Sequence, residues 1–274
     1  MRTNASGWQW HLLFLVVLVI LLYPIIFAVS TSFKSMPEAF SGTLNIIPHD
    51  PTVSAYERVL QVIPFFKILG NTFFVATVVT LFKLLTGILA AYAFVFLDFR
   101  GKQVVYFLLI STIFIPFTVI MIPNYITLSK MGLVDQLIGV ALPQLADATG
   151  IFLLRQHMKG IPSALMEVAE LEGASHLSRL RSIVVPLVRP AILSIGIIFF
   201  INSWNEYVWP AIMIKSQENY TLSLALQMFV SAEGGTDIPV AMAVSTLTML
   251  LPLALYAVCQ KFIIGTFAQS GIKG

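Results

Sequence analysis

Three ionisable side chains stand within otherwise apolar stretches of this sequence: Lys83, Asp147 and Glu206. A charged group at the centre of a membrane helix costs about 2.5–3.5 kcal/mol on insertion scales, so such residues are functional candidates. A lysine in such a place can line a route for an anionic substrate, or it can pair with an acid on a neighbouring helix. The sequence leaves both readings open, and together the three residues could also form a proton relay.

A second segment, residues 159–190, combines helix signals with a glycine turn. Pro162 suits the first turn of a helix, and Gly173 suits its left-handed end. The helix between them puts two sets of side chains on opposite faces: Leu165, Val168 and Ala169 on one, and Glu167 and Glu170 on the other. Ser175 can cap a second short helix, and Pro186 with Pro190 then opens the next apolar stretch. The segment therefore predicts a helix–glycine turn–helix protrusion.

Catalytic chemistry finds little support in the sequence. The phosphate-binding pattern Gly-x-x-x-x-Gly-Lys-Ser/Thr does not occur, so we expect no nucleotide hydrolysis on this chain. The four histidines are scattered over different segments: His11, His49, His157 and His176. Cys259 is the only cysteine, which excludes an intrachain disulfide and a cysteine metal cluster. We predict a protein that is not an enzyme, with no catalytic residue, no metal site and no cofactor.

Composition assigns the chain to the membrane. Of its 274 residues, 58% are apolar and 11% are charged, against about 45–50% and about 25% in soluble domains. A soluble fold this apolar would expose large apolar patches, which soluble monomers rarely do. No run of basic residues resembles a nucleic-acid footprint. We therefore predict an integral membrane protein that contacts lipid and no nucleic acid.

Apolar stretches long enough to cross about 30 Å of hydrocarbon predict an all-α fold with about six transmembrane helices. They lie near residues 12–32, 68–97, 104–128, 138–157, 187–214 and 240–264. The run 12–29 is longer than the apolar region of a signal peptide, so we expect it to stay as a membrane anchor. We predict one transmembrane domain over residues 1–274.

The basic residues predict that both termini are cytoplasmic. With that orientation ten of them fall in inside segments: Arg2, Arg100, Lys102, Arg155, Lys159, Arg179, Arg181, Arg189, Lys261 and Lys273. Five fall outside: Lys34, Arg58, Lys67, Lys130 and Lys215. This bias follows the positive-inside rule. It makes 159–190 a cytoplasmic loop between the fourth and fifth spans and 215–239 an extracytoplasmic loop. The outer segment 33–67 is proline-rich, with one short helix expected near residues 55–62.

The cytoplasmic loop resembles that of permease subunits of ABC importers. Their loop reads Glu-Ala-Ala, three residues, Gly, nine residues, Ile, one residue, Leu-Pro. Here Glu167-Val168-Ala169, Gly173, Ile183 and Val185-Pro186 stand in the same register, with Val168 and Val185 as the two departures. The six-span topology, the Gly-Ile-Lys-Gly terminus and the Trp-Asn-Glu-Tyr segment at 204–207 are also similar to the carbohydrate-uptake branch of that family, which contains the maltose-type permeases.

The resemblance implies a type I ABC importer permease fold in which the protrusion is a coupling helix that docks into an ATPase subunit. The residues it implies at that contact are Glu167, Ala169, Gly173, Ala174 and Pro186. Residues 271–274 are implied near the same contact. The implied partners are a second permease subunit in a heterodimer, two ATPase subunits carrying ATP and Mg, and an extracytoplasmic substrate-binding protein. The implied location is a bacterial or archaeal cytoplasmic membrane.

The stretch from Lys83 to Phe94 and the segments 63–66 and 204–210 look like the sn-glycerol-3-phosphate permease subgroup. That likeness implies sn-glycerol-3-phosphate or a related glycerophosphodiester as substrate, with a pathway of Lys83, Trp204, Asn205, Glu206 and Tyr207. A neutral sugar or oligosaccharide of the maltose or trehalose type is the alternative, because a sugar ring also stacks on aromatic rings and hydrogen-bonds to amides and acids. Two other classes stay open: an ion-coupled secondary transporter and a structural membrane scaffold.

Overall fold

The computed structural model describes residues 7–41, 45–230 and 237–271, with side chains as far as Gln260. Within these ranges the chain is helical and contains no strand. The described residues form two compact units: one from Met1–Phe66 with Leu222–Leu251, and one from Lys67–Thr221 with Pro252–Gly274. The division of the chain into one permease domain with two named loops remains a prediction.

Four helices are the longest elements: α1 (Gly7–Thr31), α4 (Phe65–Phe96), α11 (Val185–Asn205) and α14 (Ile238–Gly271). Ten shorter α-helices separate them: α2 (Met36–Phe40), α3 (Ser54–Val62), α5 (Lys102–Ser111), α6 (Phe117–Lys130), α7 (Leu137–Ala141), α8 (Ala148–Lys159), α9 (Ser163–Leu171), α10 (His176–Arg179), α12 (Val208–Met213) and α13 (Leu222–Val230). Three short 3₁₀ turns, Thr112–Phe114, Leu142–Gln144 and Gln217–Asn219, and one π turn, Leu180–Val184, complete the described part. The short helix expected near residues 55–62 is confirmed as α3.

Four helical stretches are long and apolar enough to cross a membrane, and two bent helix pairs raise the possible number to six. The predicted spans 12–32, 68–97 and 240–264 correspond to α1, α4 and α14. Most side chains of α1 are exposed, and only Ala28, Ser30 and Thr31 are buried. An apolar helix with so little protein around it is suited to lipid contact.

The third and fourth predicted spans are bent helix pairs, a feature that hydropathy did not predict. The third bends by 100° between Phe114 and Phe117. Pro116 disfavours helical geometry at the residue before it, and Ile115 is accordingly extended, with φ −87° and ψ 111°. The fourth bends by 47° between Gln144 and Ala148, where Asp147 is extended and starts α8.

The fifth predicted span, 187–214, is also interrupted. Helix α11 ends at Asn205, Glu206 is extended with φ −66° and ψ 126°, and α12 begins at Val208. At its other end the helical stretch reaches back to His176, well before the predicted start. The Trp-Asn-Glu-Tyr segment is therefore a junction between two helices, and its side chains have different surroundings.

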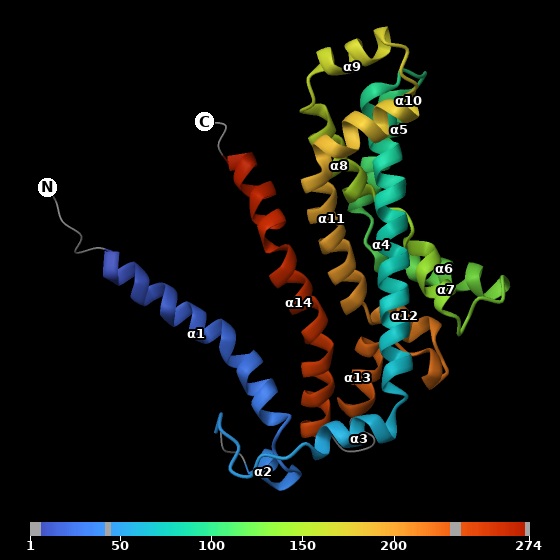
Figure 1. Cartoon of the computed structure of the whole chain (residues 1–274). Coiled ribbons are helices and arrows are strands. Elements are labelled where there is room, and N and C mark those ends of the chain that lie inside the picture. The colour runs from blue at the N-terminus through green and yellow to red at the C-terminus, as the bar shows by residue number, and fades with distance from the viewer. Residues whose placement is uncertain (1–6, 42–44, 231–236, 272–274) are drawn as a thin grey trace, which may run out of the picture. The chain divides into compact units, whose positions relative to one another are not determined.

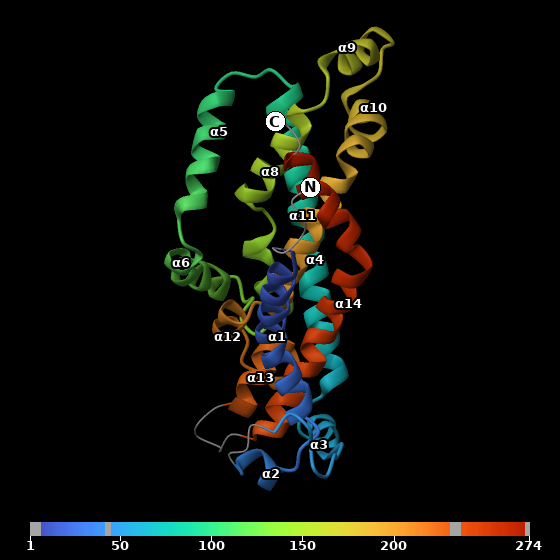
Figure 2. The same cartoon turned by 90° about the vertical axis from the view of Figure 1, so that its left-hand side faces the viewer.

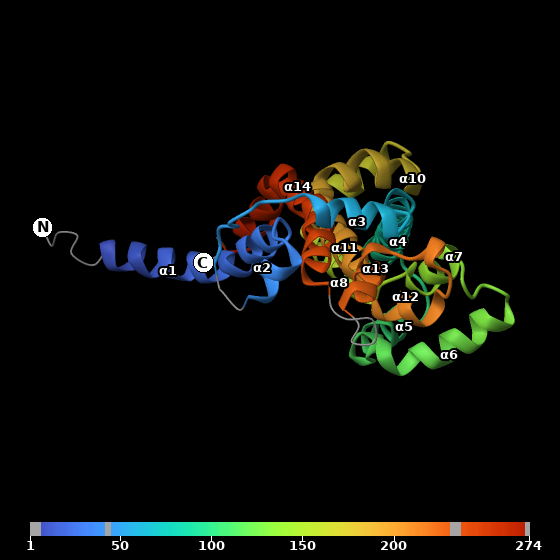
Figure 3. The same cartoon turned by 90° about the horizontal axis from the view of Figure 1, so that it is seen from below.

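In the second unit α4, α8 and α11 run side by side (Figure 1). Glycines allow these helices to approach closely: a Cβ on Gly87 would lie 3.0 Å from Leu154, and one on Gly196 would lie 3.0 Å from Leu84. Small residues at helix contacts are typical of membrane proteins, whose helices associate through close packing. Helices α5 and α6 lie on one side of this group and α10 lies on the other (Figures 2 and 3).

Candidate substrate pathway and coupling segment

Helix α9 (Ser163–Leu171) lies at one end of the second unit (Figure 1). Pro162 occupies its N-cap position, and the chain reverses at Gly173, whose φ is +77°. The backbone N–H of Ala174 donates to the carbonyl of Ala169 across 2.9 Å, which closes the helix end as left-handed glycine caps do. Ser175 then caps α10, accepting from the N–H of Ser178. The predicted helix–glycine turn–helix protrusion is present.

The two faces of α9 differ from the expected division. Met166 and Ala169 are buried, while Leu165 and Val168, which were predicted to share a face with Ala169, are 46% and 54% exposed. Met166 packs into a core cluster that includes Val184 and Val188, and this contact fixes which side of α9 faces inward. The outward side of α9 is therefore partly apolar, with Glu167 exposed beside it.

A polar chain links α9 to the long helix α4. Arg179 on α10 donates to the carboxylate of Glu170 on α9 across 2.9 Å. The same guanidinium lies 3.3 Å from Nδ1 of His176, and that nitrogen lies 3.2 Å from the hydroxyl of Tyr92 on α4. Arg179 and Tyr92 are buried. Helix α9 is therefore connected to α4 by side-chain hydrogen bonds through α10.

Pro186 stands in the first turn of α11, inside the longer helical stretch His176–Asn205, so its missing N–H leaves one carbonyl of the preceding turn without a helix bond. The π turn Leu180–Val184 precedes it, and the N–H of Val185 donates to the carbonyl of Leu180, five residues back. Single π turns occur often at functional sites. Pro190, which was expected together with Pro186 to open the fifth span, lies inside α11, and the helix continues through it.

Lys83 on α4 lies between an acid and an aromatic ring. Its Nζ is 3.6 Å from Oδ2 of Asp147 and 5.1 Å from the ring centroid of Phe199 on α11. The lysine side chain is 15% exposed. Asp147 is the N-cap of α8, and its other oxygen accepts from the N–H of Gly150 across 2.7 Å. The acid that pairs with Lys83 through one oxygen thus also caps α8 through the other.

Like Asp147, Glu206 both caps a helix and lies beside a cavity. Its Oε1 accepts from the N–H groups of Val208 and Trp209 at 2.9 and 3.2 Å, which caps the start of α12. Glu206, Lys83 and Asp147 all line one cavity of about 380 Å³. The polar groups Gln144 and Thr149 share that lining, together with apolar side chains of the bent segment between α5 and α6. A cavity with both charged and apolar walls can bind a polar organic ligand.

The remaining predicted pathway residues do not line this cavity. Trp204 is fully buried, and its ring stacks on Phe200 with centroids 5.8 Å apart. Asn205 and Tyr207 are exposed. The structure therefore brings Lys83, Asp147 and Glu206 together and leaves the neighbours of Glu206 in other surroundings.

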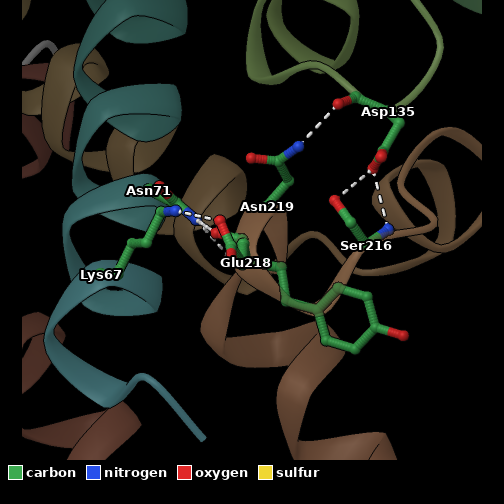
Figure 4. Close-up of polar contacts among 7 residues, drawn as sticks. Lys67, Asn71, Asp135, Ser216, Glu218 and Asn219 are labelled. Carbon is green, nitrogen blue, oxygen red and sulfur yellow. Dashed lines mark hydrogen bonds and ion pairs between the residues drawn. The ribbon is translucent and has the colours of Figure 1, made fainter.

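A polar clasp holds the first part of the predicted extracytoplasmic loop, residues 215–220 (Figure 4). One carboxylate oxygen of Asp135 accepts from the N–H of Lys215 and from the N–H and hydroxyl of Ser216, each at 2.9 Å. These bonds lower the pKa of Asp135 to about 2, the backbone N–H of Ser216 contributing most. Asp135 itself has φ +61°, a left-handed conformation that aspartate tolerates better than most residues.

Two residues of α4 also bind the segment 215–220. The side-chain amide of Asn71 donates to the carbonyls of Glu218 and Tyr220 at 2.8 and 3.0 Å. Lys67 pairs with Glu218 at 2.6 Å and lowers the pKa of this fully exposed carboxylate. The loop start is thus attached both to α4 and to the turn before α7. Residues 231–236 of the predicted loop, and residues 272–274 of the predicted ATPase-contacting tail, lie outside the described residues.

Sequence reasoning missed several of these residues. The link from α9 to α4 consists of Tyr92, His176 and Arg179. Its only sequence signal is the spacing of Arg179 and Glu170 across the glycine turn. The capping roles of Asp147 and Glu206 were missed because the helix breaks beside them were not expected. Among the described residues no group of three or more His, Cys, Asp or Glu side chains could hold a metal ion.

Comparison with known proteins identifies the family. The model of the family described as "Binding-protein-dependent transport system inner membrane component" matches residues 83–266, which is more than half of the chain. A protein named as ABC transporter permease ORF2 from Caldicellulosiruptor sp. (strain Rt8B.4) is 32% identical, with 97% of each chain covered. An sn-glycerol-3-phosphate transport system permease from Rhizobium meliloti (strain 1021) is 27% identical, with 93% of each covered.

Other similarities agree with this assignment. An arabinooligosaccharides transport system permease from Halalkalibacterium halodurans is 24% identical over 98% of this chain and 97% of that protein. A chain in the crystal structure of a bacterial ABC transporter involved in the import of the acidic polysaccharide alginate has a TM-score of 0.83 at 25% identity, covering 95% of this chain and 99% of that one. The chain has the type I permease fold, with several apolar helices for a multi-pass membrane protein. It belongs to the family of binding-protein-dependent transport system inner membrane components, the non-catalytic transmembrane subunits of ABC importers.

Proposed function

We propose that this chain translocates an anionic, carbohydrate-derived substrate by ATP-driven alternating access, with sn-glycerol-3-phosphate or a related glycerophosphodiester as the first candidate. It works as a heterodimer with a second permease and with two ATPase subunits, which hold the ATP and Mg. An extracytoplasmic binding protein delivers the substrate to the loop 215–239. Both chain termini and α9 lie on the cytoplasmic side of a bacterial or archaeal membrane, as the distribution of basic residues indicates.

The observation that carries the coupling proposal is the surface of α9. Leu171 is 89% exposed, and Leu165 and Val168 are about half exposed on a helix that ends at a rigid glycine turn. Apolar side chains exposed on such a protrusion suit a groove on a soluble partner. Glu167 beside them can pair with a basic group of that partner. Closure of the two ATPases around ATP then moves α9 and, through Arg179 and Tyr92, the helices behind it.

The substrate proposal rests on Lys83. Its ammonium lines a cavity of about 380 Å³ and is 3.6 Å from an acid that also caps a helix, so an anionic group can compete for it. The similar proteins support an anionic class, since they include several sn-glycerol-3-phosphate permeases and a transporter involved in the import of an acidic polysaccharide.

A neutral sugar or oligosaccharide is the second candidate. The two acids of the cavity, Asp147 and Glu206, outnumber its one lysine, and Gln144 and Thr149 supply neutral hydrogen-bonding groups. One of the similar permeases belongs to an arabinooligosaccharides transport system. In this case Lys83 serves mainly to neutralise Asp147.

Two experiments test the proposal. The first purifies the chain from its native host and measures ATP-dependent uptake in vesicles. We expect an ATPase and a second permease to co-purify and uptake to stop without ATP. Uptake that continues on an ion gradient alone would contradict the coupling scheme.

The second experiment compares Lys83→Met and Lys83→Arg in uptake of sn-glycerol-3-phosphate and of a neutral oligosaccharide. We expect Lys83→Met to reduce uptake of the phosphorylated ligand by about tenfold or more, because a charge-assisted contact is lost. Lys83→Arg keeps the charge and should retain most of the uptake. Transport of the neutral sugar alone by the unmodified protein would favour the second candidate.

A further inference from the structure

A second charged cavity lies away from the substrate pathway. It has a volume of about 480 Å³ and is formed where α4 ends, α5 begins and α8 ends. Its polar lining comprises Asp98, Lys102, Gln103, Tyr106, Arg155 and Lys159. Because three helix ends meet there, the cavity lies at the edge of the apolar spans and not in their middle. The basic-residue distribution predicts that this edge is the cytoplasmic one.

The charge balance of this cavity is positive. Three cations line it against a single carboxylate, that of Asp98. The Asp98 side chain is fully exposed and lies 3.5 Å from Nζ of Lys102. Lys102 also donates to the backbone carbonyl of Leu97 across 2.7 Å, which caps α4. The acid therefore offsets the lysine nearest to it, and no acidic side chain in the cavity lining offsets Arg155 and Lys159.

Two residues that line the cavity, Tyr106 and Arg155, each carry one buried polar atom without a hydrogen-bond partner in the described part of the chain. The guanidinium of Arg155 stacks on the ring of Tyr106, 3.9 Å from its centroid. Within the described residues, neither Nε of Arg155 nor the hydroxyl of Tyr106 has a hydrogen-bond partner. Buried donors usually find partners, and an unpaired one costs about 1–3 kcal/mol. A guanidinium and a hydroxyl on one wall form a donor pair suited to the oxygens of a phosphate group.

The surroundings of the cavity favour a lipid over a soluble phosphate ester. On α5 the residues Lys102, Gln103 and Tyr106 share the cavity side. Three other residues of α5, Val104, Phe107 and Leu108, are large, apolar and about 60–70% exposed. An acyl chain can therefore pack along the outer side of α5 while its headgroup enters the cavity. Basic pockets between membrane helices are known to bind anionic headgroups in this way.

We propose that this cavity binds the phosphate of an anionic phospholipid, with Arg155, Tyr106 and Lys159 as its principal ligands. The site is independent of the transported substrate and of the coupling scheme. Bound lipid would fill the space between α5 and the α4–α8 pair, and so support the position of the bent third span.

The test uses the assembled transporter in nanodiscs of phosphatidylcholine with rising fractions of phosphatidylglycerol, and counts retained lipids by native mass spectrometry. Three variants are compared with the unmodified protein. Arg155→Gln removes the guanidinium, and Tyr106→Phe keeps the stacked ring but removes the hydroxyl. Arg100→Gln is the matched control, because Arg100 is an exposed cation near the cavity that does not line it.

We expect the unmodified protein and Arg100→Gln to retain phosphatidylglycerol selectively. Arg155→Gln should reduce this retention by about tenfold, and Tyr106→Phe by a smaller factor, since a hydrogen bond to a charged group is lost in each. Equal retention of the two lipids, or variants no different from Arg100→Gln, would overturn the proposal. Displacement of phosphatidylglycerol by inorganic phosphate would instead assign the site to a soluble phosphate ester. If Arg155→Gln fails to assemble, Tyr106→Phe alone decides the outcome.

Discussion

Arg179 on α10 and Glu170 on α9 form an ion pair of 2.9 Å across the left-handed turn at Gly173. The arginine side chain is 9% exposed and the glutamate 71%. An ion pair with one exposed partner contributes about 0–1 kcal/mol to stability. Its importance is geometric, because it joins the two helices of the protrusion and, through His176, connects them to Tyr92.

Breaking this pair should uncouple ATP hydrolysis from transport. In Arg179→Met we expect normal membrane insertion and ATPase binding, but fewer substrate molecules imported per ATP, because α9 can move without moving α4. The ratio of uptake to phosphate release in proteoliposomes measures this. Glu170→Gln should give a milder defect of the same kind. If the double variant Glu170→Arg with Arg179→Glu fails to recover any coupling, the pair itself is not the transmitting contact.

The conformation of Gly173 gives a second prediction. A Cβ at this position would meet no atom within 4 Å, so any penalty comes from its φ of +77° and not from crowding. Gly173→Val should weaken the protrusion and reduce uptake several-fold, because β-branched residues are strongly disfavoured in this conformation. Gly173→Asn should be much milder, since asparagine tolerates it. Equal defects in the two variants would point to a steric contact with the ATPase instead.

Removing the charge of Asp147 should change the affinity for an anionic substrate. Asparagine is as good a helix N-cap as aspartate, so Asp147→Asn should preserve the start of α8. The ammonium of Lys83 then loses its acidic neighbour at 3.6 Å. We expect the concentration for half-maximal uptake of sn-glycerol-3-phosphate to fall several-fold, and that of a neutral sugar to stay unchanged. A rise for the anionic substrate would show that Lys83 needs the acid to hold its position.

Close packing between α8 and α11 provides a stability test. A Cβ on Gly150 would lie 2.4 Å from Cζ of Phe199, the ring beside Lys83. Gly150→Ala should therefore destabilise the protein by about 1–3 kcal/mol, as overpacking does. Gly70→Ala on α4 is the control, because a Cβ there meets nothing within 4 Å and alanine favours helix. Thermal unfolding in detergent should show a lower midpoint for the first variant and an equal or higher one for the second.

The hydrogen bonds of Asp135 to residues 215 and 216 predict that this segment is sensitive to acid. Its pKa is lowered from 3.8 to about 2, so the folded state favours the charged carboxylate. The stabilisation is complete above about pH 4 and is lost as the pH falls toward 2. The protection factors of the backbone amides of Lys215 and Ser216, which divide out the intrinsic pH dependence of hydrogen exchange, should therefore fall over that range. Asp135→Asn, which keeps the left-handed conformation, should have lower protection factors at pH 6 and lose their fall between pH 4 and 2; an unchanged profile of protection factors would exclude Asp135 as its source.

The sequence predicted the helices better than it predicted their interruptions. Hydropathy located α1, α4 and α14 because each is one long helix that contains a continuous apolar run. Hydropathy alone did not reveal the 100° bend before Phe117, although Pro116 is a sequence signal for a helix break at Ile115. The Glu167–Gly173 spacing located α9, but the side of α9 that faces inward depends on Met166, which packs in a core cluster with Val184 and Val188.

The candidate pathway shows the same limit. Lys83, Asp147 and Glu206 stood out because charges are rare in apolar spans, and the cavity does bring them together. Trp204, Asn205 and Tyr207 were predicted from the resemblance and from the ability of rings and amides to bind a sugar, yet none of the three lines the cavity. The sequence shows which residues could bind a ligand. It does not show where their side chains point, because that depends on where each helix ends in the folded protein.

The carboxylates of Asp147 and Glu206 both accept backbone N–H groups at the start of a helix. Amide dipoles there offset part of each negative charge, so the negative potential in the cavity is weaker than the formal charges suggest. Under the proposed function, two uncapped acids would repel a phosphate group. The two caps would instead leave the ammonium of Lys83 available to an anionic substrate.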